Sequence, residues 1–343
     1  MKKLLVLVFA LMMCMAACAY AAETTYSGAC APIVINTAGE HTIILNNATI
    51  GGAGAAGISV EAPATKLTIV LKSGTMNEVR GDDGFAAIAN NGLPVVIRCE
   101  ETGASHEWSF NCGHLSVVNN GLGAAIGSGE GEDFTGSIVI ESGDIVADSV
   151  WGAAIGSGQD GDFAGTVIIK GGLIVADGAA YGAGIGSGNN GDFIGTVTIA
   201  GGEVIADGGN GAGIGAGQNG DFNGKVTLRG DIEVQASGVR GIGAGYNAPM
   251  GANSEIYVEP VFDNINVEQG NSAYSMTALQ GAPYAVKTNL TALLNGSSRV
   301  RVQTVSAPEV PQTGDSMNFV LLAAMAIAGM IGMTVILRRK NEA

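Results

Sequence analysis

A motif of glycines around one isoleucine recurs at a near-constant interval through the middle of the chain. The isoleucines of this motif are Ile126, Ile155, Ile185, Ile214 and Ile242. A second column with the same step contains phenylalanine, at Phe134, Phe163, Phe193 and Phe222. Self-similarity at a fixed interval of about 29 residues is typical of a solenoid, in which every copy forms one turn and packs on the next.

Each repeat contains short extended runs bounded by glycine. Residues 196–199 alternate polar and apolar side chains, which places Val197 and Ile199 on one face of a strand. The density of glycine and the lack of a 3.6-residue period exclude helix across the repeats. Short strands that each pair with their copy in the next turn predict an all-β fold, the parallel β-helix.

Weaker copies of the motif extend the expected solenoid toward the N-terminus. Ile58 and Ile88 lie 30 residues apart in the same register as the later isoleucines. The prolines beyond residue 245 predict a cap that protects the open edge of the last turn. We therefore expect an N-terminal segment at 22–34, the β-helix at 35–245, a C-terminal cap at 246–297 and a tether at 298–309.

The first 21 residues have the parts of a secretory signal peptide. Two lysines precede an apolar stretch, and Ala19 and Ala21 supply the small residues that signal peptidase recognises. Cleavage is expected before Ala22. Two alternatives remain open, namely an uncleaved membrane anchor and a lipoprotein signal that ends at Cys18.

A second apolar stretch lies near the other end of the chain. Residues 319–337 are long enough to cross a bilayer, and the basic residues that follow at once hold that end in the cytoplasm. The pentapeptide that precedes them is Val310, Pro311, Gln312, Thr313 and Gly314. Pentapeptide, apolar stretch and basic tail, in this order, resemble the sorting signal of sortase-anchored surface proteins of Gram-positive bacteria, whose usual motif is Leu-Pro-any-Thr-Gly.

This resemblance, over residues 310–343, implies secretion and a covalent link to peptidoglycan. In that family sortase cuts between threonine and glycine, here the bond between Thr313 and Gly314, and joins the new carboxylate to an amine of the cell wall. Membrane insertion of the apolar segment is then transient. Val310 replaces the usual leucine, which leaves the choice of sortase open. The alternative is a permanent single-pass membrane protein.

The charge of the chain limits its partners. The 16 basic and 31 acidic residues give a net charge of −15, and the two targeting ends hold several of the basic ones. Such an acidic surface repels phosphate backbones and attracts divalent cations. We therefore expect no nucleic-acid partner.

Three cysteines remain after cleavage of the signal peptide, at Cys30, Cys99 and Cys112. An odd number argues against a disulfide framework. Either Cys99 and Cys112 pair across an excursion that contains Trp108, or both stay reduced, and Cys30 is left over in both cases. The histidines are scattered and no cysteine pair has the spacing of zinc ligands, so no zinc site is expected.

Three segments of the first third of the chain, at residues 42–50, 67–79 and 84–88, resemble a known family. They are similar to bacterial extracellular carbohydrate-binding proteins that fold as a right-handed parallel β-helix, related in shape to pectate lyases. The resemblance covers about residues 35–245. It implies a right-handed coil and, as in some members of that family, binding of plant cell-wall polysaccharides with calcium.

Aspartates form a further column in the repeats. Asp133, Asp162, Asp192 and Asp221 each precede one of the repeated phenylalanines. Like charges stacked a few ångströms apart raise one another's energy, and a Ca²⁺ ion held by carboxylate oxygens relieves this repulsion. These four residues are therefore candidate calcium ligands. The alternative is that they accept backbone hydrogen bonds at tight corners.

Two aromatic residues occupy equivalent positions in consecutive repeats. Trp151 and Tyr181 each come directly before a Gly-Ala pair. Two aligned rings one turn apart form a small stacking surface for a sugar, or else they only cover a corner of the coil.

Catalytic patterns do not emerge from the sequence. No Ser-His-Asp order or Cys-His pairing points to a nucleophile, and the arginines do not recur in a column as the base of a lyase requires. We expect a wall-anchored protein without catalysis that binds a polysaccharide or a host glycan, as an adhesin does. A structural rod that contacts a protein partner and a polysaccharide lyase are the alternatives.

Overall fold

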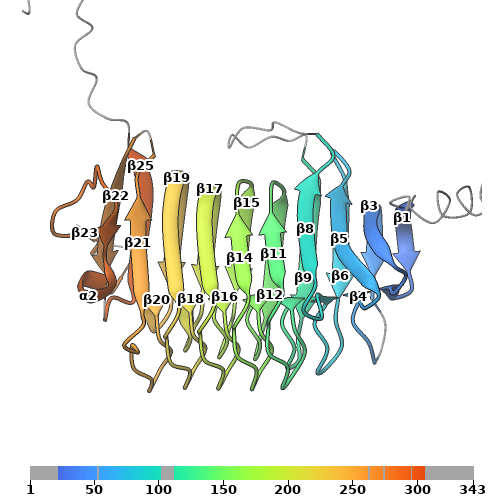
Figure 1. Cartoon of the computed structure of the whole chain (residues 1–343), viewed down its shortest axis with the longest axis horizontal. Helices are drawn as coiled ribbons and strands as arrows, with labels where there is room; N and C mark the ends of the chain where they lie inside the picture. Colours follow the sequence, from blue (N-terminus) through green and yellow to red (C-terminus); the bar gives the residue numbers. More distant parts are fainter. Residues whose placement is uncertain are drawn as a thin grey trace, which may run out of the picture. The chain divides into compact units, whose positions relative to one another are not determined.

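The computed structural model describes residues 22–51, 54–101, 112–261, 263–272, 275–294 and 296–305. These residues form a β-solenoid of about 7 turns with parallel sheets (Figure 1), which confirms the all-β repeat fold expected from the sequence. Among them, no helix has the length and apolar composition needed to cross a membrane. The signal peptide (1–21), Trp108 and the sorting signal with its apolar stretch (310–343) lie outside the described residues.

Two columns of strands make one 17-stranded sheet, because β3, β17 and β19 each pass through both columns. The first column consists of β3 (Gly39–Ile50), β5 (Ala64–Leu71), β8 (Pro94–Cys99), β11 (Ser137–Ile140), β14 (Thr166–Ile169), β17 (Thr196–Asp207), β19 (Lys225–Ser237) and β21 (Glu255–Glu259). The second column consists of the later halves of those three strands together with β6 (Met76–Arg80), β9 (His114–Asn119), β12 (Asp144–Ser149) and β15 (Leu173–Asp177).

The third column is an eight-stranded sheet of very short strands. Its members are β2 (Ile33–Ile35), β4 (Ile58–Val60), β7 (Ile88–Ala89), β10 (Ile126–Gly127), β13 (Ile155–Gly156), β16 (Ile185–Gly186), β18 (Ala212–Gly215) and β20 (Arg240–Gly243). The repeated isoleucines pair with one another in register. The repeated phenylalanines form single parallel bridges, with ring centroids 4.8 to 5.1 Å apart. Both columns predicted from the sequence are therefore confirmed.

The hydrophobic core lies inside the coil because side chains alternate along each strand. In β14, Val167 and Ile169 are completely buried, whereas Thr166 and Ile168 lie on the half-buried outer face. The inward residues of β14 pair in register with the inward isoleucines of β11. Each such side chain contributes about 1.5–3 kcal/mol on burial, and the neighbouring turns provide the apolar surface that a single turn lacks.

Gly156 shows why the corners require glycine. Its φ angle is 145°, a conformation that residues with a Cβ rarely adopt. A Cβ on Gly156 would also overlap the carbonyl oxygen of Gly186 in the next turn. Gly127 and Gly215 repeat both features. The glycine of the motif is therefore fixed by backbone conformation and by the close approach of adjacent turns.

Buried serines connect successive turns at the same corner. The hydroxyl of Ser157 donates to the carbonyl of Gly161 at 2.6 Å and accepts the backbone N–H of Gly188 at 3.1 Å. Ser187 accepts the N–H of Gly217 in the same way, at 3.0 Å. Each buried hydroxyl is thereby satisfied, as is an amide of the following turn.

Parallel stacking extends beyond the interval 35–245 expected from the repeats. At the N-terminal end β1 (Ala22–Cys30) pairs with β3, and at the other end β21 pairs with β19. β1 and β21 lack the glycine motif, but the alternation of inward and outward side chains along each strand is sufficient to add a turn. In β21 it buries Ile256 and Val258 and leaves the residues between them on the outer face.

Antiparallel strands close the C-terminal end of the solenoid (Figure 1). The expected cap contains β22 (Asn264–Gly270), β23 (Thr277–Ala278), β24 (Thr288–Asn289) and the short helix α2 (Thr291–Leu294). β25 (Arg299–Val305) lies where the sequence predicted a tether, and it pairs with β19 and β22. This segment is a strand because Val300 and Val302 are buried in the closing layer.

Candidate functional site

The structure brings Trp151 and Tyr181 together at the corner that follows the second column of strands. Their ring centroids lie 4.2 Å apart and the ring planes differ by 20°. The two positions are equivalent in consecutive turns, since Gly182 packs directly on the backbone of Gly152. The rings therefore stack along the axis of the solenoid. Both are half-buried, so part of each ring remains at the surface.

The ring stack ends in the next turn. Asn210 occupies the position equivalent to Tyr181, because Gly211 packs on Gly182 as Gly182 packs on Gly152. Asn210 is exposed and has no ring. One face of each ring is thus occupied by the other ring, and the far face of Tyr181 is directed toward a turn with a small polar side chain.

A column of carboxylates precedes the ring residues in the same turns. Asp148, Asp177 and Asp207 pair in register at the ends of their strands, and Ser237 continues the column. The carboxylate of Asp177 accepts the N–H of Ala179 at 2.7 Å, and that of Asp207 accepts the hydroxyl of Ser237 at 3.0 Å. Three consecutive turns thus present one carboxylate each.

The first carboxylate of this column has an altered acidity. Burial raises the pKa of the Asp148 carboxyl above its ordinary value, and the negative charge of Asp177 in the next turn raises this pKa further. The side chain is nevertheless half exposed. A partly desolvated carboxyl next to a like charge binds a hydrogen-bond donor more readily than a fully hydrated one does.

The carboxylates and the rings belong to one corner because the loop between them closes on itself. Gly178, which follows Asp177, lies so close to the backbone of Gly182 that a Cβ would meet its carbonyl oxygen at 2.6 Å. Asp177 and Tyr181 therefore flank the two ends of a tight loop. We call the set Asp148, Trp151, Asp177, Tyr181 and Asp207 the ring–carboxylate corner.

Backbone hydrogen bonds from the following turn reach both ring residues. The backbone N–H of Asn189 donates to the carbonyl of Trp151, and that of Gln218 donates to Tyr181, at 2.9 and 2.8 Å. These contacts join each turn to the corner of the preceding one. They hold the rings in place from the backbone, so the ring–carboxylate corner is built on a rigid scaffold.

The column of candidate calcium ligands has a different geometry. Oδ1 of Asp133 accepts the backbone N–H of Asp162 at 2.9 Å, and Asp162 accepts that of Asp192 at 2.8 Å. The structure therefore brings the four predicted aspartates into one ladder. Each of the first three uses one oxygen to hold the next turn. Within the part of the chain that the structure describes, no three His, Cys, Asp or Glu side chains gather closely enough to hold a metal ion.

The positive-φ residues beside this ladder explain the Asn-rich loops. Asp160, Asn190 and Asn219 have φ angles of 59°, 64° and 62°. The side chain of Asn190 donates to Asp160 at 2.8 Å and accepts from Asn219 at 3.0 Å. Asn and Asp tolerate the left-handed conformation better than other residues with a side chain, which accounts for their repetition here.

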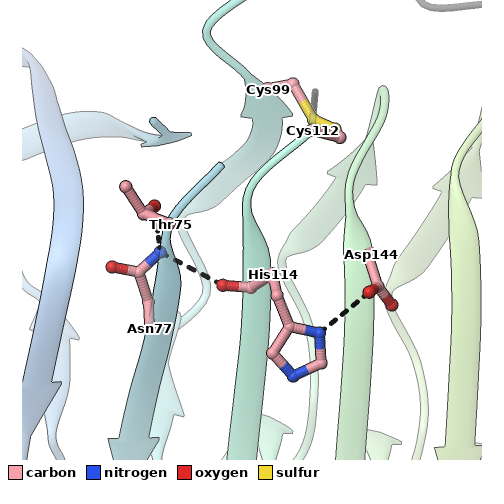
Figure 2. A network of polar contacts seen from close by, with 6 residues as sticks. All are labelled: Thr75, Asn77, Cys99, Cys112, His114 and Asp144. Carbon is pink, nitrogen blue, oxygen red and sulfur yellow. Dashed lines mark hydrogen bonds and ion pairs between the residues drawn. A yellow bond between two sulfur atoms is a disulfide. The ribbon is translucent and has the colours of Figure 1, made fainter. Parts of the chain in front are cut away.

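A polar network that the sequence analysis missed lies nearer the N-terminal end of the second column (Figure 2). Nδ1 of His114 and Oδ2 of Asp144 are 3.0 Å apart, and the two residues pair in register on β9 and β12. The amide of Asn77 donates to the backbone carbonyl of His114 at 3.1 Å and to the hydroxyl of Thr75 at 3.0 Å. Asn77 thus contacts the backbone of His114, whereas the imidazole faces Asp144.

A disulfide lies two residues before His114 (Figure 2). Cys99 and Cys112 are bonded, with their Cα atoms 5.6 Å apart, and this settles the pairing that the sequence left open. The bond closes the base of the longer connection between β8 and β9. Cys30 is a free thiol on β1, and it is partly exposed.

The fold and the columns of side chains define a parallel β-solenoid with an aromatic and acidic corner. No protein-family model, no curated protein and no solved structure matches the chain. The sortase-type pentapeptide, Val310 to Gly314, lies outside the described residues.

Proposed function

We propose that this protein is a cell-wall-anchored surface protein that binds a polysaccharide or a host glycan at the ring–carboxylate corner, without catalysis. The observation that carries the proposal is the stack of Trp151 and Tyr181 beside the carboxylates of Asp148, Asp177 and Asp207. Aromatic rings bury the apolar C–H faces of sugars, and carboxylates accept hydrogen bonds from sugar hydroxyls.

The repeat supports a polymer as the ligand more than a single sugar. Carboxylates recur in register in three consecutive turns and rings in two, so a linear chain that runs along the solenoid axis contacts several of these groups at once. The scaffold is held by backbone hydrogen bonds between all adjacent turns, and a preorganised site loses little entropy on binding.

The two ends of the chain supply the location in this proposal. The signal peptide (1–21) exports the chain, and sortase cuts the bond between Thr313 and Gly314 and links the protein to peptidoglycan of a Gram-positive cell wall. Segment 319–337 inserts into the membrane only until that step. The right-handed coil expected from the family resemblance, and calcium as a cofactor at Asp133, Asp162, Asp192 and Asp221, belong to the same proposal.

A glycan array probed with the mature chain, Ala22 to Thr313, tests the binding. We expect the wild type to be retained on one class of polysaccharide. The variant Trp151→Ala/Tyr181→Ala should bind this polysaccharide with about tenfold weaker affinity, because it lacks both aromatic rings. Phe85→Ala is the matched control, since Phe85 is an aromatic residue with 47% exposure outside the corner. Equal affinity of the double variant and the wild type would contradict the assignment of the corner.

The absence of any retained glycan would favour the second function considered from the sequence, a rod that contacts a protein. An outer stripe of Val146, Val175 and Ile205 runs in register along the second column and supports that alternative. These side chains are half-buried, and the carboxylate column of Asp148, Asp177 and Asp207 runs along one side of them. An unsaturated-uronate absorbance assay on the same preparation tests the lyase alternative.

A further inference from the structure

The N-terminal turn leaves the end of the hydrophobic core uncovered. Tyr26 and Cys30 are the inward residues of β1, and they pair in register with Leu45 and Ile50 of β3. The two partners are 0% exposed, whereas Tyr26 and Cys30 remain partly exposed while they pack on the core. At the edge of the other sheet, Val34 of β2 is 50% exposed.

The backbone of this turn is open as well. Within the described residues β1 pairs with β3 on one side, and β2 pairs with β4 on one side. Unpaired N–H and C=O groups on an edge strand are a template for another strand. Proteins often block such an edge with lysine, proline or a β-bulge; β1 has no lysine or proline, and its one irregularity is the register shift between Tyr26 and Gly28.

The C-terminal end of the same solenoid differs in this respect. There β25 pairs antiparallel with β19, and β22 continues the layer. Leu279, Leu290 and Leu294 lie beneath these strands and are 0 to 3% exposed. Among the residues that the structure describes, one end of the core is thus covered by β22 and β25, and the other end has no such cover.

In the mature chain of the proposed function, no residue precedes β1 to cover it, a step that rests on the proposed processing. Cleavage before Ala22 makes Ala22 both the new N-terminus and the first residue of β1. After the sortase cut, residues 306–313 extend at most about 28 Å from β25. The solenoid of about 7 turns is about 34 Å long at the spacing of paired strands.

The charge of the N-terminal turn favours a second copy of this chain as the partner that covers the open edge of β1. Between Ala22 and Ile50 the charged side chains are Glu23 and Glu40, in a protein with a net charge of −15. Glu40 is paired with Lys66 at 3.1 Å. Two N-terminal turns therefore approach each other with little repulsion, whereas the acidic columns of the later turns stay apart.

We propose that two copies of the protein associate end to end through their N-terminal turns, with β1 of one copy antiparallel to β1 of the other about a two-fold axis. This symmetry makes the same patch serve both copies. The contact continues the sheet across both molecules and covers Tyr26, Cys30 and Val34. Because the anchored end of the chain is the opposite one, the contact lies at the end farthest from the wall.

Sedimentation velocity of the mature chain, Ala22 to Thr313, under reducing conditions tests this association. We expect the wild type to have twice the mass of one chain and Thr25→Lys/Ser27→Lys to have the mass of one chain, because two cations at exposed positions of the edge strand repel their copies. The control Thr135→Lys/Ala252→Lys adds the same charge at exposed positions elsewhere and keeps the doubled mass.

Three results would overturn the proposal: a wild-type monomer over the whole concentration range, an unchanged dimer in the edge variant, or a dimer that disappears on reduction. The last would identify a cross-link through Cys30 instead. Thermal unfolding of each variant shows that it is folded. The variant Trp151→Ala/Tyr181→Ala stays dimeric, so a failure of glycan binding and a failure of this association are distinguished.

Discussion

Oδ1 of Asp192 accepts the backbone N–H of Asp221, one full turn further along the chain, at 2.8 Å. The same bond joins Asp162 to Asp192 and Asp133 to Asp162. A side chain at the corner of one turn therefore determines how the next turn is seated. This relationship gives the aspartate before each phenylalanine a structural role, and it makes a direct prediction.

Replacement of Asp192 by alanine should lower the free energy of unfolding by about 1–3 kcal/mol, because the N–H of Asp221 loses its acceptor in a half-buried corner. Asp192→Asn keeps an acceptor oxygen and should lie within about 1 kcal/mol of the wild type. Urea unfolding of the three proteins measures both values. If calcium is bound by the column, the free energy of unfolding of Asp192→Asn should equal that of the wild type only in the presence of a chelator. It should fall below the wild-type value when calcium is added.

Replacement of Gly186 by alanine should be far more damaging than the size of a methyl group suggests. The φ angle of Gly186 is 145°, and a Cβ would overlap the carbonyl oxygen of Gly215. We expect a loss of about 4 kcal/mol or more, or failure to fold. The matched control is Gly131→Ala, at φ 66° with no atom within 4 Å of the added Cβ, for which about 1–2 kcal/mol is expected. Equal losses in chemical denaturation would show that the turns adjust to the extra atom.

The pH dependence of stability should include a contribution from Asp148. Because burial and Asp177 raise the pKa of Asp148 in the folded protein, the folded state binds its proton more tightly than the unfolded state does. The stabilising contribution is then complete below the ordinary pKa of 3.8 and is lost as the pH rises through the folded pKa.

Asp148→Asn removes this dependence. The stability of the variant relative to the wild type should increase from pH 3 upward and then level off once the carboxyl of the wild type is ionised. Thermal unfolding over a pH series measures the difference, with Glu101→Gln, an exposed carboxyl outside the corner, as the control. A constant difference between Asp148→Asn and the wild type over the whole series would show that this group does not titrate differently in the two states.

Removal of the disulfide should weaken the N-terminal half of the solenoid. The bond joins residues 13 apart, and closure of a loop of this size restricts the unfolded chain by about 3 kcal/mol. Cys99→Ser/Cys112→Ser should therefore lower the free energy of unfolding by about 2–4 kcal/mol relative to Cys30→Ser, which removes only the free thiol. Identical unfolding midpoints would mean that the bond does not constrain the chain in solution.

The repeat columns were predictable because each residue in them obeys a rule that holds in every turn. Ile155 pairs with Ile185, and Phe163 with Phe193, since the same backbone path returns after one turn. The alignment of Trp151 with Tyr181 follows from the same interval. A period in the sequence therefore becomes a contact in space.

The ends of the solenoid were less predictable because no period marks them. β25 is a strand only because β19 and β22 lie on either side of it, and residues 233–237 and 299–303 are far apart in the sequence. The pair of His114 and Asp144 does have the interval of one turn, 30 residues. The pair does not form part of a repeated column, however, because the partner of His114 in the preceding turn is Met76 and the partner of Asp144 in the following turn is Leu173.

The register between Phe163 and Phe193 has a genetic consequence. The upper and lower surfaces of these turns present the same residues in the same columns, so each turn fits on a copy of itself. An in-frame duplication of residues 164–193 therefore inserts one more turn with both of its surfaces already matched, and a deletion removes one without leaving a gap. The length of the solenoid is then a quantity that recombination between near-identical segments adjusts in steps of one strand spacing, about 4.8 Å.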